Sequence, residues 1–274
     1  MKTFLIDAAK CIDCRNCQTA CKDEHCDNDW SPIAAIQAPR QYWMKVQNTE
    51  VGSGERVEMQ RIPLVCQQCE NAPCLVAAKD GAAYRRSDGI IIFDPEKAQG
   101  QKAIIQACPY GAVYWNDELD IPQKCTMCAH LKDAGRAPRC VTACPTDALR
   151  IVDSEEVEGS TTLPSAPERL HPEYGTKPQV MYQNLPRPFI AGEVCSYDER
   201  RCLSDVTVSA THQILGTHYE AVSDEFGEFK LSGLEPGFYT VVFAVAGFSR
   251  KVLTNVDARK PVNLESIRLP EHTR

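Results

Sequence analysis

The sequence predicts an α+β chain of two domains, in which a cysteine-rich domain is followed by a small all-β sandwich. Twelve of the fifteen cysteines form regularly spaced groups between residues 11 and 144. A stretch rich in Pro, Ser, Thr and acidic residues comes next, and short runs of alternating apolar and polar residues fill the rest of the chain. The predicted parts are therefore a first domain at 1–152, an extended linker at 153–187 and a β-sandwich at 188–274.

The first and last cysteine groups complement each other. Residues 11–21 have the spacing Cys-x2-Cys-x2-Cys-x3-Cys, and residues 125–145 end in Cys-Pro. In bacterial ferredoxins, three cysteines of such a run bind one four-iron cluster and the fourth binds a second cluster. The same exchange of ligands between the two groups, called crossing below, completes two clusters here and uses all eight cysteines of these groups. The predicted ligands of the first cluster are Cys11, Cys14, Cys17 and Cys144, and those of the second cluster are Cys21, Cys125, Cys128 and Cys140.

The middle of the chain repeats this pattern with one set of ligands missing. The crossing rule assigns a third cluster to Cys66, Cys69, Cys74 and Cys108. The positions where the spacing would place the ligands of a fourth cluster hold Ala78, Ala98, Gln101 and Ile104. None of these side chains offers a thiolate to iron. Because the fourth cluster lacks all its ligands at once, the sequence predicts three complete [4Fe-4S] clusters.

The cysteines also admit two other interpretations. The last group alone could form a structural zinc site, but zinc requires neither the x2-x2-x3 run nor an exchange of ligands between distant groups. A disulfide framework is disfavoured because the opening MKTFLIDAAKC has no apolar leader, which predicts a cytoplasmic location. Cys195 and Cys202 could pair if oxidised, and the sequence leaves this open.

Short strands and helices are expected around the clusters. Strands are predicted at 4–7, 89–94, 111–116 and 148–153, and Asp94-Pro-Glu predicts a helix that continues to residue 108. Cys108-Pro-Tyr-Gly and Cys144-Pro-Thr-Asp are each followed by a strand, which predicts a duplicated bacterial-type ferredoxin domain. Few large apolar residues remain for a core before residue 90, so we expect folding to depend on cluster binding.

Composition excludes several function classes. The net charge of -7, with no basic stripe, argues against nucleic acid as a partner. No apolar stretch approaches the ~18 residues that cross a bilayer, so direct membrane insertion is not expected. The chain has no flavin or nicotinamide fingerprint and no catalytic residue constellation. These observations predict a non-catalytic protein that carries electrons.

Two residues near the last cysteine group suggest more specific roles. Lys124 could place a positive charge beside a cluster. His130 follows Cys128 closely, and we interpret it as a helix residue that hydrogen-bonds nearby, because four thiolates already complete that cluster.

These motifs resemble a known family. Lys124-Cys-Thr-Met-Cys-Ala-His-Leu131, together with Cys108-Pro-Tyr-Gly111 and Gly175-Thr-Lys-Pro178, resembles the iron–sulfur subunits of molybdopterin oxidoreductases, the dimethyl sulfoxide reductase family. Most of that family has four clusters. A missing cluster and an added β-domain of transthyretin-like or carboxypeptidase-regulatory-like type make this chain similar to the branch that transfers or adds hydroxyl groups on phenolic rings.

The resemblance implies a partner that carries out the substrate chemistry. That partner would be a large catalytic subunit with molybdenum bis-pyranopterin guanine dinucleotide, in a heterodimer or an oligomer of heterodimers. The alternatives are the iron–sulfur subunit of a respiratory reductase, of arsenate, polysulfide or sulfoxide type, and a freestanding polyferredoxin. The missing cluster counts against the respiratory class, because a quinone-coupled relay needs an unbroken series. The substrate and the cluster potentials stay open.

Overall fold

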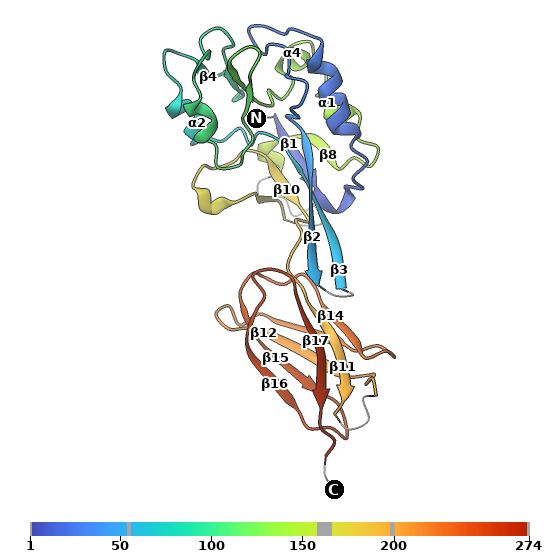
Figure 1. The fold of residues 1–274 in the computed structure, drawn as a ribbon. Helices are drawn as coiled ribbons and strands as arrows, with labels where there is room; N and C mark the ends of the chain where they lie inside the picture. The colour runs from blue at the N-terminus through green and yellow to red at the C-terminus, as the bar shows by residue number, and fades with distance from the viewer. Residues whose placement is uncertain (1, 54–55, 158–165, 198–200, 273–274) are drawn as a thin grey trace. The chain divides into compact units, whose positions relative to one another are not determined.

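The computed structural model describes residues 2–53, 56–157, 166–197 and 201–272. The chain divides into two compact units. The first comprises Met1–Gln47 and Arg61–Leu185, and the second comprises Asn48–Gln60 and Pro186–Arg274. Figure 1 shows short helices and strands in the first unit and long strands in the second.

A four-stranded sheet organises the first unit, in the order β8-β1-β10-β9. Strand β1 (Lys2–Asp7) pairs antiparallel with β8 (Leu149–Asp153) and parallel with β10 (Met181–Gln183). The short β9 (Glu168–Arg169) pairs antiparallel with β10. Strand β1 lies between β8 and β10 (Figure 1), and all its residues after the first are buried. This sheet brings the start of the chain next to its last cysteine group.

Part of the stretch expected to be an extended linker belongs to this sheet. Residues 153–187 include β9, β10, the helix α6 (Ser154–Val157) and the 3-10 helix η2 (Pro172–Tyr174). Tyr182 of β10 is fully buried, where its hydroxyl donates to the carbonyl oxygen of Pro63 at 3.1 Å. The sequence prediction differs here because a three-residue strand has no visible alternation. Pairing with β1 creates the strand.

Short elements connect this sheet to the cysteines. The helices are α1 (Asn16–Cys26), α2 (Pro73–Ala77), α3 (Ala103–Gln106), α4 (Ala129–Asp133) and α5 (Arg139–Thr142). Two small hairpins join β4 (Ala83–Arg85) to β5 (Ile91–Phe93) and β6 (Tyr114–Asn116) to β7 (Ile121–Gln123). Cysteines and large apolar side chains share one core, which includes Cys17, Cys21, Cys66, Cys125, Cys140, Phe4, Trp43 and Tyr182.

The helix predicted from Asp94 to residue 108 is wrong in length. Asp94 does accept bonds from the N–H groups of Glu96 and Lys97, at 3.1 and 3.2 Å, as a helix N-cap would. Turns follow, and Gly100 adopts a left-handed φ of 73° while its N–H donates to the carbonyl oxygen of Asp120 at 2.8 Å. Glycine adopts this conformation readily. The tertiary bond therefore ends the first turn, and α3 begins anew at Ala103.

The sequence analysis missed the longest hairpin, β2 (Lys45–Ser53) with β3 (Arg56–Leu64). Most side chains of β2 are exposed, so no apolar alternation reveals a strand. Residues 48–60 at its tip belong to the second unit, although the sequence analysis placed them in the first domain. Within that unit, Asn263 donates to the carbonyl oxygen of Ser53 at 2.9 Å.

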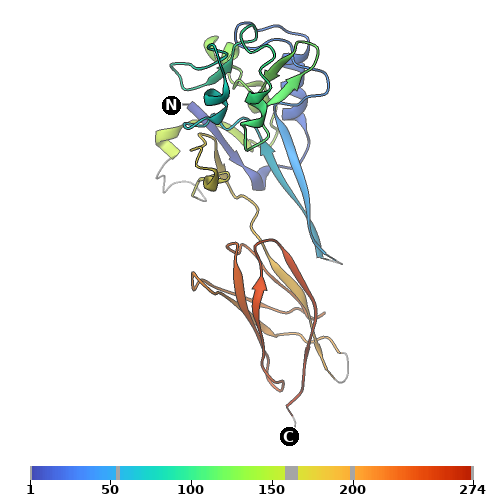
Figure 2. The same cartoon turned by 60° about the vertical axis from the view of Figure 1, so that its left-hand side comes forward.

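The second unit is built from two sheets, with strand orders β14-β11-β17 and β13-β12-β15-β16. Its strands, orange to red in Figure 2, are β11 (Ile190–Ser196), β12 (Thr207–His212), β13 (His218–Val222), β14 (Glu228–Leu231), β15 (Phe238–Ala244), β16 (Lys251–Asp257) and β17 (Val262–Leu269). Inward-facing residues of both sheets form one core. Gly192 fits because a Cβ there would lie 2.9 Å from the carbonyl oxygen of Glu265.

Cys195 and Cys202 lie directly opposite each other in an antiparallel bridge. The bonds Ser196 N–H to Arg201 O, at 2.7 Å, and Leu203 N–H to Val194 O, at 2.9 Å, flank the two cysteines. The cysteines are therefore a non-hydrogen-bonded pair, for which the Cα atoms are about 4.5 Å apart. This separation lies within the range of about 4.4–6.8 Å that a disulfide spans.

We predict that a small disulfide reagent, added anaerobically to the cluster-loaded protein, joins Cys195 to Cys202. Mass spectrometry of the tryptic peptides should show one cross-linked pair that has lost two hydrogen atoms. Cys202→Ser should abolish the product and serves as the control. Alkylation of both thiols after complete reagent treatment would contradict the prediction.

Candidate metal centres

The first predicted set of ligands surrounds one cavity. Cys11, Cys14, Cys17 and Cys144 all line it, together with apolar side chains such as Leu149. Three of these cysteines come from the loop after β1 and the start of α1, and Cys144 lies between α5 and β8. Burial raises the pKa of Cys17 to about 12, and the neighbouring Cys11 thiolate adds to the rise. The pairing of β1 with β8 thus brings these distant thiols together.

Three of the four Cys-x2-Cys segments, the loops that start at Cys11, Cys66 and Cys125, share an unusual backbone conformation. The residue before the second cysteine has a left-handed φ in each loop, at 58° for Asp13, 48° for Gln68 and 52° for Met127. This region is uncommon for residues other than glycine. In the third loop the N–H of Met127 donates to Cys125 Sγ at 3.4 Å. Non-glycine residues keep such strained conformations where the surrounding structure enforces them, and functional sites are frequent places.

The two Cys-Pro turns are also alike. The third residue after the cysteine has a left-handed φ, at 58° for Gly111 and 53° for Asp147. Burial raises the pKa of Cys108, and hydrogen bonds from the N–H groups of Ala112 and Tyr110 partly offset this rise. For Cys144 burial also raises the pKa, but the surrounding backbone N–H groups outweigh it and lower the pKa overall. Both turns therefore direct backbone donors at a cysteine sulfur.

The second set lies deepest in the unit. Cys21, Cys125, Cys128 and Cys140 are all buried. Burial raises the pKa of Cys125 to about 12 and that of Cys128 to about 11. It also raises the pKa of Cys140, and the charges of Cys125, Cys21 and Cys128 raise it further. These four thiols are close enough to affect one another's ionisation.

The third set gathers the middle cysteines. Burial raises the pKa of Cys74 to about 12, and the charges of Cys66, Cys108 and Cys69 add to the rise. A hydrogen bond from the hydroxyl of Thr176 favours the thiolate of Cys69, although burial still raises its pKa to about 11.

Thr176 belongs to the stretch once expected to be a linker. It is buried, and its hydroxyl shares a 2.7 Å hydrogen bond with that of Tyr110. The N–H groups of Glu70 and Asn71 donate to the carbonyl oxygens of Lys177 and Thr176, both at 3.0 Å. These hydrogen bonds hold the Gly-Thr-Lys-Pro motif, residues 175–178, beside the third set of thiols.

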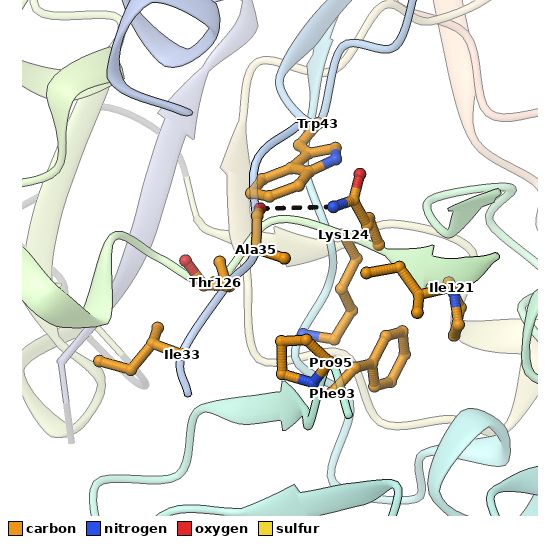
Figure 3. Close-up of a pocket in the computed structure, with 11 residues that line it drawn as sticks. Ile33, Ala35, Trp43, Phe93, Pro95, Ile121, Lys124 and Thr126 are labelled. Carbon is orange, nitrogen blue, oxygen red and sulfur yellow. Dashed lines mark hydrogen bonds between the residues drawn. The ribbon is translucent and has the colours of Figure 1, made fainter. Parts of the chain in front are cut away.

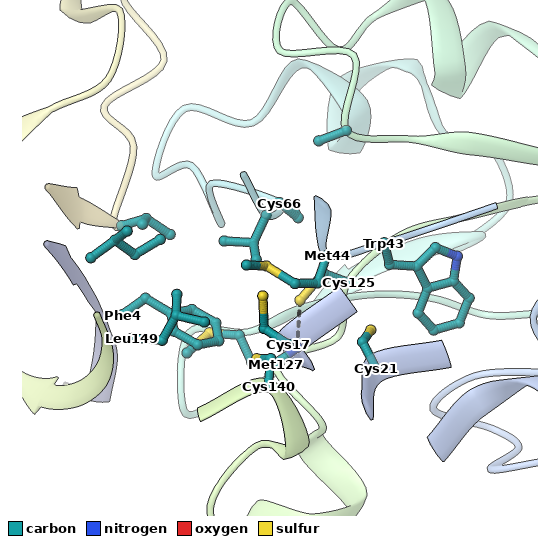
Figure 4. Packing of buried hydrophobic residues seen from close by; sticks show 14 of the residues in the cluster. Phe4, Cys17, Cys21, Trp43, Met44, Cys66, Cys125, Met127, Cys140 and Leu149 are labelled. Carbon is teal, nitrogen blue, oxygen red and sulfur yellow. Dashed lines mark hydrogen bonds between the residues drawn. The ribbon is translucent and has the colours of Figure 1, made fainter. Parts of the chain in front are cut away.

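Electrostatic effects link the second set of thiols to each of the other two sets. The charge of Cys17 affects the pKa of Cys21 and Cys140, which connects the first set to the second. The charge of Cys66 affects that of Cys125, which connects the third set to the second. Figure 4 shows Cys66, Cys125 and Cys17 among the buried residues of one core. Raised pKa values keep most of these groups as thiols at neutral pH in the absence of metal, so metal binding must release protons.

A single metal ion fits less well than a cluster. Across the described ranges, no three His, Cys, Asp or Glu side chains are placed to hold one metal ion. A four-iron cluster takes each thiolate on a different iron atom, so its ligands need not converge on one point.

Comparisons with known proteins agree with these features. Residues 57–154 match the 4Fe-4S dicluster domain, and residues 190–270 match the carboxypeptidase regulatory-like domain. Over 97% of this chain and 98% of the relative, the sequence is 38% identical to the pyrogallol hydroxytransferase small subunit of Pelobacter acidigallici. The chain belongs to the family of iron–sulfur subunits of molybdopterin oxidoreductases. Its predicted function as an electron-transfer subunit of a molybdoenzyme is confirmed.

Other members of the family match a smaller part of the chain. A sulfite dehydrogenase subunit of Allochromatium vinosum is 33% identical over 67% of this chain and 82% of its own length. A tetrathionate reductase subunit of Salmonella typhimurium is 31% identical over 68% of this chain and 74% of its own length. The predicted order, a cluster domain followed by a carboxypeptidase-regulatory-like domain, is confirmed. Among the described residues, no helix has the length and apolarity to span a membrane.

Lys124 places a buried cation among the thiols of this family member. Only 2% of it is exposed, and its Nζ donates to the carbonyl oxygens of Ile91 and Cys125, the latter at 3.2 Å. The ammonium lies 5.1 Å from the centre of the Phe93 ring, beside the small pocket drawn in Figure 3. Burial raises the pKa of Cys74, and the charge of Lys124 opposes that rise. Lys124 therefore favours thiolates in the third set.

The sequence analysis missed His25. Its Nε2 lies 3.8 Å from Cys128 Sγ, and burial lowers its pKa to about 3, which keeps the ring neutral. His25 follows Cys21 by four residues on α1, so both side chains lie on one face of that helix. That spacing was a signal in the sequence. His130 of α4 bonds Glu24 at 3.0 Å, as the sequence analysis expected of a helix residue beside the cluster.

Apolar packing occupies the positions where a fourth set of ligands would lie. Ala98 and Ile104 are fully buried in a hydrophobic cluster that also includes Ala82 and Ile91, with Ala78 packed against it. Gln101 accepts a 2.9 Å bond from the N–H of Lys79 and donates to the carbonyl oxygen of Lys97 at 2.8 Å. These contacts replace cluster ligation with an ordinary core.

We predict that Ala78→Cys leaves the iron content unchanged, because a single thiol beside a packed core cannot hold a cluster. Iron per chain and the spectrum of the reduced protein should match those of Ala78→Ser, which makes a similar change without a thiol. A gain of about four iron atoms per chain would contradict the prediction.

Proposed function

We propose that this chain binds three [4Fe-4S] clusters through the three sets of four cysteines described above. Such clusters supply one-electron transfer when bound. Each set joins cysteines from at least two distant segments, and the thiols within each set affect one another's pKa. The crossing of ligands between segments supports cluster ligation over zinc.

We infer that the cluster domain is a duplicated ferredoxin. The Cys108 and Cys144 turns share a left-handed residue three positions after the cysteine, and the loops that start at Cys11, Cys66 and Cys125 share one before the second cysteine. Independent loops have no reason to adopt the same uncommon backbone conformation at equivalent positions. A repeat that has lost one set of ligands accounts for both the likeness and the missing cluster.

Electrons exchange with the partner at the first cluster in this proposal. Cys14 is exposed, and the neighbouring Ile12 is 62% exposed, whereas every cysteine of the second set is buried. Electron tunnelling weakens steeply with distance, so the partner must approach the most accessible set. An exposed apolar side chain beside it also suits a protein interface.

The proposed partner is a large catalytic subunit with molybdenum bis-pyranopterin guanine dinucleotide, which acts on a phenolic ring by hydroxyl transfer or hydroxylation. The observation that carries this proposal is the match over 97% of the chain to a pyrogallol hydroxytransferase small subunit. The sulfite dehydrogenase and tetrathionate reductase subunits leave about a third of the chain unmatched. The heterodimer, or oligomer of heterodimers, and its cytoplasmic location stay predictions.

Iron analysis tests the ligand sets. Anaerobically purified protein should contain about twelve iron atoms and about twelve acid-labile sulfides per chain, as three four-iron clusters require. Cys74→Ala should lower the iron content to about eight and leave the other two clusters spectroscopically intact, since Cys74 belongs to one set only.

Cys26→Ala is the matched control, because Cys26 lies in the first unit outside the three sets. It should retain all the iron. Loss of all clusters from a folded Cys74→Ala protein would show that the crossing is wrong, and stoichiometric zinc in the wild type would reject the cluster assignment.

Co-expression of both subunits tests the partner. With a tag on this chain and a host that makes the cofactor, molybdenum and pterin should co-purify. Ile12→Glu should reduce the yield of complex while its iron content stays normal, because a charge would be buried at the interface. Val76→Glu, at an exposed apolar residue on α2, is the control and should assemble normally.

A complex from such a host that lacks molybdenum and pterin would reject the molybdenum proposal and favour a freestanding polyferredoxin. Equal assembly of the Ile12→Glu and wild-type chains would place the interface elsewhere.

A further inference from the structure

His25 is a buried imidazole with one polar neighbour. It is 2% exposed, and its Nε2 lies 3.8 Å from the sulfur of Cys128, within hydrogen-bond distance for sulfur. Its Nδ1 is buried without a hydrogen-bond partner in the described part of the chain. A buried polar atom without a partner is costly, so its arrangement calls for a reason.

The proton of the neutral ring belongs on Nε2. A neutral imidazole carries its proton on one nitrogen and a lone pair on the other. A thiolate that binds iron can only accept a hydrogen bond. A proton on Nδ1 would have no acceptor there, and the Nε2 lone pair would then face an electron-rich sulfur. The tautomer with Nε2–H directed at Cys128 is therefore favoured.

Neighbouring rings fix the orientation of His25. The Trp43 ring centre lies 4.7 Å away at 44°, and the His130 ring meets His25 edge-on with centres 5.3 Å apart. His130 is itself held, since it stacks on Trp30 at 4.2 Å and bonds Glu24 at 3.0 Å.

Glu24 in turn holds His130 and Trp30 in place. Its second carboxylate oxygen lies 3.2 Å from Arg139 Nε, next to Cys140, and its carbonyl oxygen accepts a 3.0 Å bond from the Trp30 indole. The imidazole of His25 is thus preorganised toward one sulfur by packing rather than by bonds of its own.

We propose that His25 is a positioning residue that donates a hydrogen bond from Nε2 to the Cys128 thiolate and raises the reduction potential of the second cluster. The inference rests on the proposed cluster ligation. Reduction adds negative charge to a cluster and its sulfurs, so a donor at the sulfur stabilises the reduced form more than the oxidised form. The potential is therefore higher with the bond than without it.

The effect is specific to one cluster, because the equivalent cysteines have different surroundings. Cys14, Cys69 and Cys128 are each the second cysteine of a Cys-x2-Cys loop. Cys14 is exposed, Cys69 receives a bond from the hydroxyl of Thr176, and Cys128 faces the imidazole of His25. Three loops of one backbone conformation thus give three clusters different environments.

Redox titration of the anaerobically purified full-length protein, followed by electron paramagnetic resonance, tests the proposal. In His25→Phe, one of the three reduction potentials should fall and the other two should stay within error. In His25→Gln, whose side-chain amide keeps a donor, that potential should return toward the wild-type value. His212→Phe, which changes a buried histidine of the second unit, should leave all three close to the wild type.

A second measurement does not depend on the variants folding. Wild-type protein labelled with ¹⁵N-histidine should show a histidine nitrogen coupled to a reduced cluster by electron–nuclear double resonance. The coupling should persist in His212→Phe and vanish in His25→Phe.

The outcomes separate this inference from the function on which it rests. Wild-type protein without four-iron clusters would reject the proposed function. Full iron content with three unchanged potentials in His25→Phe would overturn the role of His25 alone. An equal fall in His212→Phe would show that the effect does not depend on the contact between His25 and Cys128, and the absence of histidine coupling in the wild type would overturn the proposed bond.

Discussion

Burial of the cysteine thiols is the constraint on which the first unit depends. Burial raises the pKa of most of them well above neutral, so an unliganded thiolate there is unfavourable, and iron is the partner that offsets its charge. The thiols of the first set also come from opposite ends of the cysteine-rich region, which runs from Cys11 to Cys144. The N–H of Asp7 donates to the carbonyl oxygen of Ala148 at 2.8 Å, so the sheet that closes the fold also aligns Cys11 with Cys144.

Where thiols are absent, ordinary packing takes over. In the proposed duplicated scaffold, the hydrophobic cluster around Ala98 and Ile104 takes the place of the missing site. The remaining sites are distinguished by polar groups that do not bind metal themselves. Lys124 is a buried cation next to the third set, and Thr176 and His25 direct donors at different cysteines. A series of similar clusters can acquire different potentials in this way.

The sequence predicted the elements whose signal is local. Cysteine spacing predicted three sets of ligands, which stay a prediction, and alternation predicted most strands of the second unit. Prediction from the sequence failed where tertiary contacts determine the local structure. The β10 strand exists because β1 pairs with it, α3 begins late because Gly100 bonds Asp120, and the polar β2–β3 hairpin carries no apolar pattern. His25 carries only a weak signal in the sequence, its four-residue spacing from Cys21, because its contact with Cys128 joins segments about a hundred residues apart.

The crossing of ligands between distant segments is the central claim, and anomalous scattering from iron tests it most directly. Crystals of the anaerobic, cluster-loaded protein, measured on both sides of the iron absorption edge, should show three groups of four iron atoms. The account predicts that Cys11, Cys14, Cys17 and Cys144 bind the first group, and that Cys21 binds another group with Cys125, Cys128 and Cys140. A single group bound by Cys11, Cys14, Cys17 and Cys21 would contradict it.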